Sequence, residues 1–192
     1  EAILLVGAAA VAAVLAAAFL GDDDPLFLAS AYSFGVNTAE YPNGAIGHFI
    51  TTTGDNNYPD GKASTIDANI GQFYHGYIFP YTGSYGAGAT ANNFWPVLGN
   101  HDWNTAGAVP YLNYFVLPNN ERYYAFVRGP VHFFMIDSDD HEPDGNTSNS
   151  TQATWLKNKL AAATEPWKLV FLHHTPFSSR TSTTSLQWPY RQ

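Results

Sequence analysis

Trp95-Pro-Val-Leu-Gly-Asn-His-Asp-Trp103 is the stretch around which the rest of the chain is organised. An apolar run ends just before Gly99, and an amide, an imidazole and a carboxylate follow at once. Glycine permits a sharp turn that a side chain would obstruct. We therefore predict a loop at a strand end, from which Asn100 and His101 point in different directions. Asp102 is positioned to orient the imidazole.

Two further polar clusters follow apolar runs. Residues 49–53 alternate like a half-buried strand and lead into Gly54-Asp-Asn-Asn-Tyr58. Residues 167–172 have the composition of a buried strand and end in His173-His174. Ligands of open α/β sheets bind beyond the carboxyl ends of the strands. The three clusters are therefore expected to converge.

These blocks resemble the ordered motifs of the metallophosphoesterases, the calcineurin-like superfamily, and within them those of the purple acid phosphatase-like branch. The matching blocks are Gly54-Asp55…Tyr58, Gly99-Asn100-His101-Asp102 and Val170-Phe-Leu-His173. The resemblance implies an α/β fold in which a β-sandwich is flanked by helices. We further expect this fold to be incomplete at the C-terminus, where the last motif is missing, and to be preceded by an apolar N-terminal helix.

The chemistry that the resemblance implies is hydrolysis of a phosphate ester with metal ions, namely Fe, Zn or Mn. The implied metal ligands are Asp55, Tyr58, Asn100 and His173. Asp55 would bridge two ions, and Tyr58 would bind a ferric ion as a phenolate. His101 is the implied catalytic residue with Asp102 as its partner, and His174 is placed on the substrate side.

Two blocks of the family pattern are missing. Ser33 stands where the first metal-binding aspartate is expected, between a first strand at 26–29 and a loop at 34–38. A hydroxyl supplies neither the charge nor the bridging capacity of a carboxylate. The Gly-His-x-His block would lie beyond Gln192. We therefore expect an impaired site that holds one metal ion rather than two, in a piece of a longer phosphatase or in a family member reused as a structural subunit.

Composition excludes several classes of protein. The 192 residues are 45% hydrophobic and 16% aromatic, which suits one globular domain. Eight Lys and Arg against sixteen Asp and Glu give a formal charge of −8, without a basic stretch, so nucleic acid is not an expected partner. The absence of cysteine excludes disulfides, iron–sulfur clusters and thiolate zinc sites.

Residues 2–20 are uncharged and almost wholly apolar, and Asp22-Asp-Asp24 separates them from the rest. As a helix they would be about 30 Å long, enough to span a bilayer. Their alanine content equally favours close packing against sister helices. We divide the chain into an apolar segment with its linker, 1–24, and a metallophosphoesterase-like domain, 25–192. An extracellular, cell-surface or periplasmic location follows, with residues 1–20 held in a membrane or in a homo-oligomer such as a filament. Packing of these residues onto their own domain is the third alternative.

The rest of the sequence predicts helices, strands and loops that support the site. We expect a helix from about residue 65 to 77, a loop over 81–93 and a helix that begins at the cap Ser150 and ends at Pro166. A strand pair opens near 121, and its second member, 131–136, is central and is joined by a crossover helix to a parallel neighbour. A helix over 39–47 is doubtful because of its proline and glycines. For 138–150 we favour a solvated loop over a calcium site.

Overall fold

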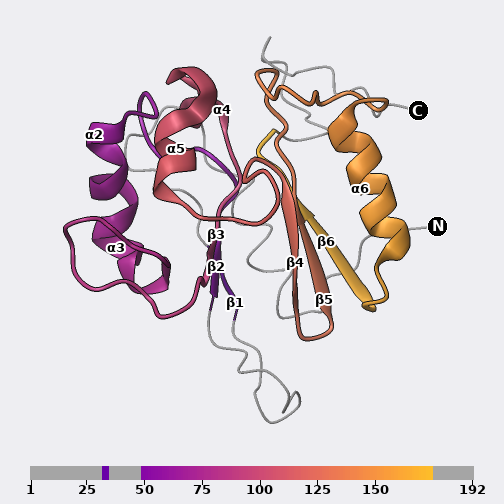
Figure 1. Ribbon diagram of the computed structural model, residues 1–192, viewed down its shortest axis with the longest axis horizontal. Helices are drawn as coiled ribbons and strands as arrows, with labels where there is room; N and C mark the ends of the chain where they lie inside the picture. The colour runs from indigo at the N-terminus through magenta and orange to yellow at the C-terminus, as the bar shows by residue number, and fades with distance from the viewer. Residues whose placement is uncertain (1–31, 35–48, 175–192) are drawn as a thin grey trace.

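The computed structural model describes residues 32–34 and 49–174. They form two three-stranded sheets with helices on the outer side of each, so that the strands lie between helical layers (Figure 1). This mixed α/β arrangement agrees with the fold expected from the sequence. The predictions for residues 2–20, 26–29 and 39–47 lie outside the described residues.

The first sheet consists of β1 (Tyr32–Phe34), β2 (Phe49–Thr51) and β3 (Phe94–Trp95). β1 is antiparallel to β2, and β2 is parallel to β3. Because β2 and β3 run in the same direction, the loops that follow them leave the sheet at the same edge. Both loops carry polar clusters that the sequence singled out.

The second sheet consists of β4 (Tyr124–Arg128), β5 (Val131–Met135) and β6 (Trp167–Phe171). β5 lies between the other two, antiparallel to β4 and parallel to β6. The predicted central strand, its partner and the parallel strand after the crossover helix are therefore confirmed. Glycine and proline at 129 and 130 make the short turn between β4 and β5.

Aromatic side chains join the two sheets. Phe49 of the first sheet meets Phe126 and Phe133 of the second edge-on, with ring centroids 5.9 and 5.4 Å apart. Trp95 stacks on Phe126 at 4.1 Å, and Phe126 stacks on Phe133 at 4.8 Å. Aromatic residues bury large areas and hold offset geometries. This cluster therefore fixes how one sheet lies on the other.

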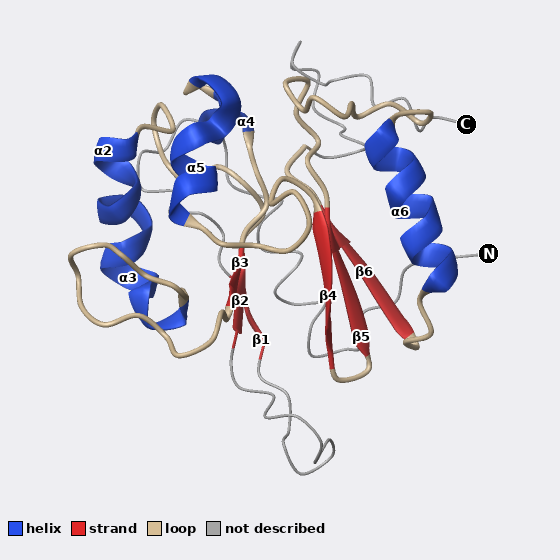
Figure 2. Ribbon diagram, viewed as in Figure 1, coloured by secondary structure: helices blue, strands red, loops and turns tan. Residues whose placement is uncertain are grey.

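A helical layer covers the outer face of the first sheet (Figure 2). Its first part winds without a break through α-, π- and 3₁₀-helical segments: α2 (Ala63–Ile66), η1 (Asp67–Gly71), α3 (Gln72–Tyr74) and η2 (His75–Tyr77). Its second part is η3 (Ala106–Ala108) and α5 (Val109–Tyr114). Ile66 and Ile70 point into the core, and Phe115 stacks on Phe94 at 5.4 Å. The predicted helix over 65–77 is confirmed.

The other outer layer is α6 (Thr151–Ala162), which lies beside the second sheet (Figure 1). Its predicted cap is confirmed, because the Ser150 side chain accepts a hydrogen bond from the Ala153 N–H at 3.1 Å. Among the helices at residues 49–174, none combines the length and apolarity that crossing a membrane requires.

The stretch after Gly99 is a helix and not the loop that the sequence predicts. α4 (Asn100–Trp103) begins directly after this glycine, whose N–H donates to the carboxylate of Asp102 at 3.0 Å. A carboxylate that accepts from the residue three positions before it stabilises the first turn of a helix. The sequence contains this signal, but four residues are too few to show helical periodicity.

Candidate metal centre

Three loops bring the candidate ligands together. Asp55 lies in the loop after β2, Asn100 begins α4 after β3, and His173 follows β6 of the other sheet. The Nε2 atom of His173 lies 3.1 Å from the Asn100 Oδ1 and 3.4 Å from the Asp55 Oδ1. These three residues are separated by up to 118 positions of sequence, so only the fold can assemble them.

The hydrogen bond on the far side of the His173 ring decides what its Nε2 atom can do. Nδ1 lies 2.7 Å from the carbonyl oxygen of Thr53. A carbonyl oxygen only accepts, so Nδ1 carries the proton of the neutral ring. The Nε2 lone pair then faces a carboxylate oxygen and an amide oxygen, which are also acceptors. Three acceptors that meet in this way require a positive charge, supplied by a second ring proton or by a metal ion.

The electrostatics of Asp55 favour a negative charge at this point. Burial raises the pKa of Asp55, but hydrogen bonds and charge from His173, the His101 N–H and the Tyr58 hydroxyl outweigh it and lower the pKa to about 2. The pKa of His173 responds in the opposite sense. Burial lowers it, but the hydrogen bond and charge of Asp55 outweigh burial and leave it raised. Asp55 is therefore ionised across the physiological range.

Two glycines make the close approach of these loops possible. A Cβ atom on Gly54 would lie 2.4 Å from the His173 Nδ1, and one on Gly99 would lie 2.3 Å from the Asp55 Oδ1. Gly54 also has a φ of +96°, and Asp55 itself has a φ of 55°, which is unfavourable for a residue with a side chain. The backbone is shaped around the candidate ligands.

His101 lies at the rim of the centre. Its N–H donates to the Asp55 Oδ1 at 2.9 Å, and its Nδ1 lies 2.6 Å from the carbonyl oxygen of Pro59. The ring packs against Tyr58 with centroids 4.2 Å apart. The Tyr58 hydroxyl donates to the Asp55 Oδ2 at 2.8 Å. With Nδ1 taken by a carbonyl, Nε2 is the atom that His101 can offer to a ligand.

The role predicted for Asp102 as the partner of this imidazole is not what the structure shows. The Asp102 Oδ2 accepts from the Gly99 N–H at 3.0 Å and from both nitrogens of Asn56 at 3.0 and 3.1 Å. Burial raises the pKa of Asp102 to about 6 despite these donors. The side chain of Asp102 turns into the protein because α4 directs it toward the loop after β2. The Pro59 carbonyl holds the imidazole instead.

His174 lies beside His173, with ring centroids 4.9 Å apart. The Ser138 hydroxyl oxygen accepts from the His174 N–H and lies 2.9 Å from the His174 Nδ1. The Ser138 hydroxyl can donate its own proton to Nδ1, and in that arrangement the ring proton of a neutral His174 is on Nε2. Burial and then the charge of His173 lower the pKa of His174. A neutral imidazole results.

The residues that hold the candidate ligands in place were not predicted from the sequence. Asn56 donates to the Val97 carbonyl at 2.7 Å and accepts from Thr52 at 2.5 Å, in addition to its bonds with Asp102. Ser138 was likewise not singled out. The signal for Asn56 is a polar residue next to a strand end, where burial demands hydrogen-bond partners. The partners themselves come from distant loops.

The segment around Ser33, which corresponds to the first aspartate motif of the family, is part of a strand in the structure. Ser33 lies inside β1, opposite Ile50. The alternation Tyr-Ser-Phe suits a strand, which explains this position. Within the described residues no three His, Cys, Asp or Glu side chains form a group that could hold a metal ion. A metal centre here therefore depends on the Asn100 amide and the Tyr58 oxygen as well.

The acidic loop after β5 has internal partners in place of a regular calcium site. Arg122 pairs with Glu142 at 3.0 Å and with Asp144 at 2.9 Å. The Asp137 carboxylate accepts from the indole of Trp103 at 2.9 Å, and Asp139 lies 2.6 Å from the His141 Nδ1. These carboxylates are therefore paired with groups of the protein itself. The loop is also more buried than the solvated loop that the sequence predicts.

Comparison with known proteins agrees with this arrangement. The protein-family model described as calcineurin-like phosphoesterase matches residues 38–190, a span that contains every side chain of the centre. No match is found among curated proteins. Calcineurin-like phosphoesterases generally bind divalent metals. Because the match covers well over half of the chain, the protein belongs to the calcineurin-like phosphoesterase family, part of the metallophosphoesterase superfamily.

Proposed function

We propose that the chain hydrolyses phosphate esters with a divalent metal ion held by Asp55, Asn100 and His173. The observation that carries this proposal is the meeting of the His173 Nε2 with one amide oxygen and one carboxylate oxygen, which lie 3.1 and 3.4 Å from it. Three protein ligands and an open position are usual for a catalytic metal. The mixture of oxygen and nitrogen donors suits Mn, Fe or Zn.

A bound divalent ion would polarise the phosphoryl group and lower the pKa of a bound water. The protein's own groups would then orient the ester. With both ring nitrogens protonated, His101 would donate from Nε2 to a phosphoryl or leaving oxygen, while its Nδ1–H donates to the Pro59 carbonyl on the opposite side of the ring. His174, whose Nδ1 contacts Ser138, would bind the ester on the substrate side. Asp102 would support this arrangement through Gly99 and Asn56.

Two finer assignments belong to the same proposal. If the single ion is ferric in place of divalent, Tyr58 would bind it as a phenolate, as in the purple acid phosphatase-like branch, and its contact with the Asp55 Oδ2 at 2.8 Å supports a shared ligand position. A visible absorption band that disappears in Tyr58→Phe would test this assignment. Ser33 offers no carboxylate, so we also propose an impaired centre with one ion in place of two.

The enzymatic test is release of phosphate from simple esters with added Mn²⁺, Zn²⁺ or Fe. Replacing His101 by Ala should lower kcat by about 100-fold or more, the size expected for loss of a proton donor, without loss of metal. Asp55→Ala should lose both metal and activity. His75→Ala is the matched control, because the His75 Nδ1 also contacts a backbone carbonyl, that of Gly71, at 3.0 Å. Full activity in His101→Ala would overturn the role given to His101.

A structural role is the second candidate function. The 19 apolar residues 2–20 favour it, because many copies could assemble through such segments into a filament or membrane array with the phosphoesterase domain as a displayed head. On either reading we propose that residues 1–24 are separate from the domain that starts at Pro25. We further propose a location outside the cytoplasm or at the cell surface.

A further inference from the structure

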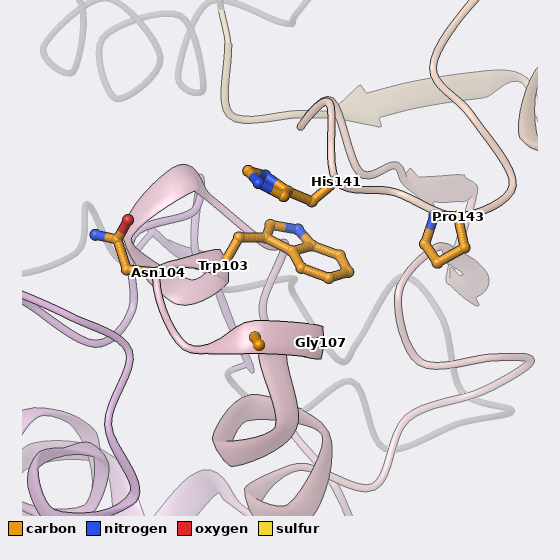
Figure 3. A pocket seen from close by; sticks show the side chains of 6 residues that line it. Trp103, Asn104, Gly107, His141 and Pro143 are labelled. Carbon is orange, nitrogen blue, oxygen red and sulfur yellow. The ribbon is translucent and has the colours of Figure 1, made fainter.

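A pocket of about 440 Å³ opens beside α4. Figure 3 shows Trp103 and His141 lying over one another, with Gly107 and Pro143 nearby. Its lining residues are Trp103, Asn104, Ala106, Gly107, His141 and Pro143. The volume falls within the range of small-molecule sites. The lining offers flat rings and small side chains in place of long flexible ones.

Hydrogen bonds to carboxylates hold the two rings of this pocket, those of Trp103 and His141, in place. The His141 ring stacks on the indole of Trp103, with centroids 6.0 Å apart and planes at 20°. The Trp103 indole donates to Asp137 at 2.9 Å, and the His141 Nδ1 lies 2.6 Å from the Asp139 carboxylate. Although its side chain is 71% exposed, His141 is therefore anchored. An exposed ring held in this way is ready to stack with a ligand.

The pocket adjoins the candidate metal centre. The Asn104 side chain donates to the carbonyl oxygen of Pro59 at 3.1 Å, the same oxygen that the His101 ring contacts. On the other wall, the loop that carries His141 and Pro143 also contains Ser138, whose hydroxyl oxygen lies 2.9 Å from the His174 Nδ1. The two walls of the pocket are thus linked through Pro59 and Ser138 to the two histidines that flank the centre.

The charge around the pocket restricts what it can accept. Asp139 and Asp140 lie in the loop that forms one wall, and the cationic side chain of Arg122 is paired with Glu142 and Asp144. A second phosphate or a carboxylate would therefore be repelled. A flat, uncharged ring would gain stacking on His141 and Trp103 without this penalty.

We propose that this pocket binds the leaving group of the substrate and selects phosphate monoesters of alcohols that carry a flat aromatic ring. The inference rests on the proposed phosphoesterase function. In the reaction, water adds to phosphorus, the bond between phosphorus and the ester oxygen breaks, and the alcohol leaves with a proton. The ring remains in the pocket while this bond breaks next to His101.

The test compares benzyl phosphate with cyclohexylmethyl phosphate, whose alcohols differ in the flatness of the ring. The parent chain should prefer the benzyl ester in kcat/KM by about 2- to 10-fold, the range expected from aromatic stacking. His141→Ala should bring this ratio close to one, and His141→Phe should keep it. Ala106→Leu, which fills the pocket from an exposed position, should also reduce the ratio.

His132→Ala is the matched control. The His132 ring also stacks on an aromatic ring, that of Phe134 at 4.3 Å, and also contacts a carboxylate, that of Glu165 at 2.8 Å, but it does not line the pocket. Its benzyl preference should equal that of the parent chain. A parent ratio of one, or an unchanged ratio in both His141→Ala and Ala106→Leu, would overturn the proposal.

A binding measurement separates this proposal from the proposed function. Benzyl alcohol titrated into the full chain should shift the indole N–H resonance of Trp103, assigned by its loss in Trp103→Phe, and the shift should disappear in Ala106→Leu. If no ester is hydrolysed but this shift is seen, the phosphoesterase function fails while the pocket binds its ligand. Hydrolysis without the shift and without a benzyl preference would contradict the pocket alone.

Discussion

Gly99 is the residue on which the geometry of the centre depends most sharply. It has an extended backbone that any residue can adopt, but a Cβ atom there would overlap the backbone nitrogen and carboxylate of Asp55 at 2.3 Å. Asp55 must therefore move if Gly99 gains a side chain. A ligand moved by about 1 Å is enough to cost about 100-fold in rate.

We predict that Gly99→Ala loses metal affinity and lowers the rate of ester hydrolysis by about 100-fold. Gly76→Ala is the control, because a Cβ atom there meets nothing within 4 Å. Metal titration followed by calorimetry, with circular dichroism to show that both variants fold, measures the effect. Equal affinity in the two variants would mean that Asp55 does not need its present position.

For single residues, the sequence predicted which candidate ligands lie close together but not which groups hold their side chains in place. Asp55, Asn100 and His173 each follow an apolar run, and that pattern predicts convergence at strand ends. The Pro59 carbonyl on His101 and the Ser138 hydroxyl on His174 depend on how separate loops cross. Such contacts have no periodicity or motif, so Asp102 was given a role that a backbone carbonyl fills.

The helix that begins at α2 is tied to the following loop by a single carboxylate. Asp67 accepts from the hydroxyls of Tyr81 and Tyr114 at 2.7 Å and from the N–H and hydroxyl of Ser84 at 2.9 and 2.8 Å. Burial raises the pKa of Asp67, but these donors outweigh it and lower the pKa from 3.8 to about 2. The charged form therefore stabilises the folded state.

The sign of the pH dependence follows from this lowered pKa. The stabilisation by Asp67 is complete above about pH 4, where the unfolded chain is also ionised, and is lost as the pH falls toward about 2. We predict that Asp67→Asn lowers the free energy of unfolding at pH 6 and that the deficit shrinks steadily below pH 4. Urea unfolding at several pH values measures it. A deficit that stays constant down to pH 2 would contradict the assignment.

Elements with a long or capped pattern were predicted well, and short ones were not. α6 has twelve residues and a serine cap, and β5 is an apolar run interrupted only by His132, so both were found. α4 spans four residues directly after a glycine, and its pattern is that of a turn as much as of a helix. β1 spans three residues and was not predicted, whereas the strand expected at 26–29 lies outside the described residues.

At the scale of the whole molecule, the two sheets and their aromatic interface explain why the centre is assembled from both. Asp55 and Asn100 follow strands of the first sheet, and His173 follows a strand of the second. The packing of Phe49 on Phe126 and Phe133 therefore sets the separation of the ligands. Sequence patterns predicted the sheets, whereas their mutual orientation depends on side-chain packing across the interface.

The apolar segment gives a prediction for the full chain. An exposed apolar helix formed by residues 2–20 would exceed the apolar patch that a soluble monomer ordinarily exposes. We expect the full chain to be found in an ordered homo-oligomer or in a membrane, and a chain that starts at Pro25 to be monomeric. Light scattering with and without detergent measures both. A full chain that stays monomeric in plain buffer would mean that the segment packs on its own domain.

The most direct test of the metal centre is anomalous diffraction from crystals soaked in Mn²⁺. The account predicts one strong peak within coordination distance of the Asp55 Oδ1, the Asn100 Oδ1 and the His173 Nε2, and loss of that peak in Asp55→Ala. Two peaks of equal height at this position would contradict the single-ion centre. A peak bound elsewhere, with none between these three atoms, would contradict the metal centre itself.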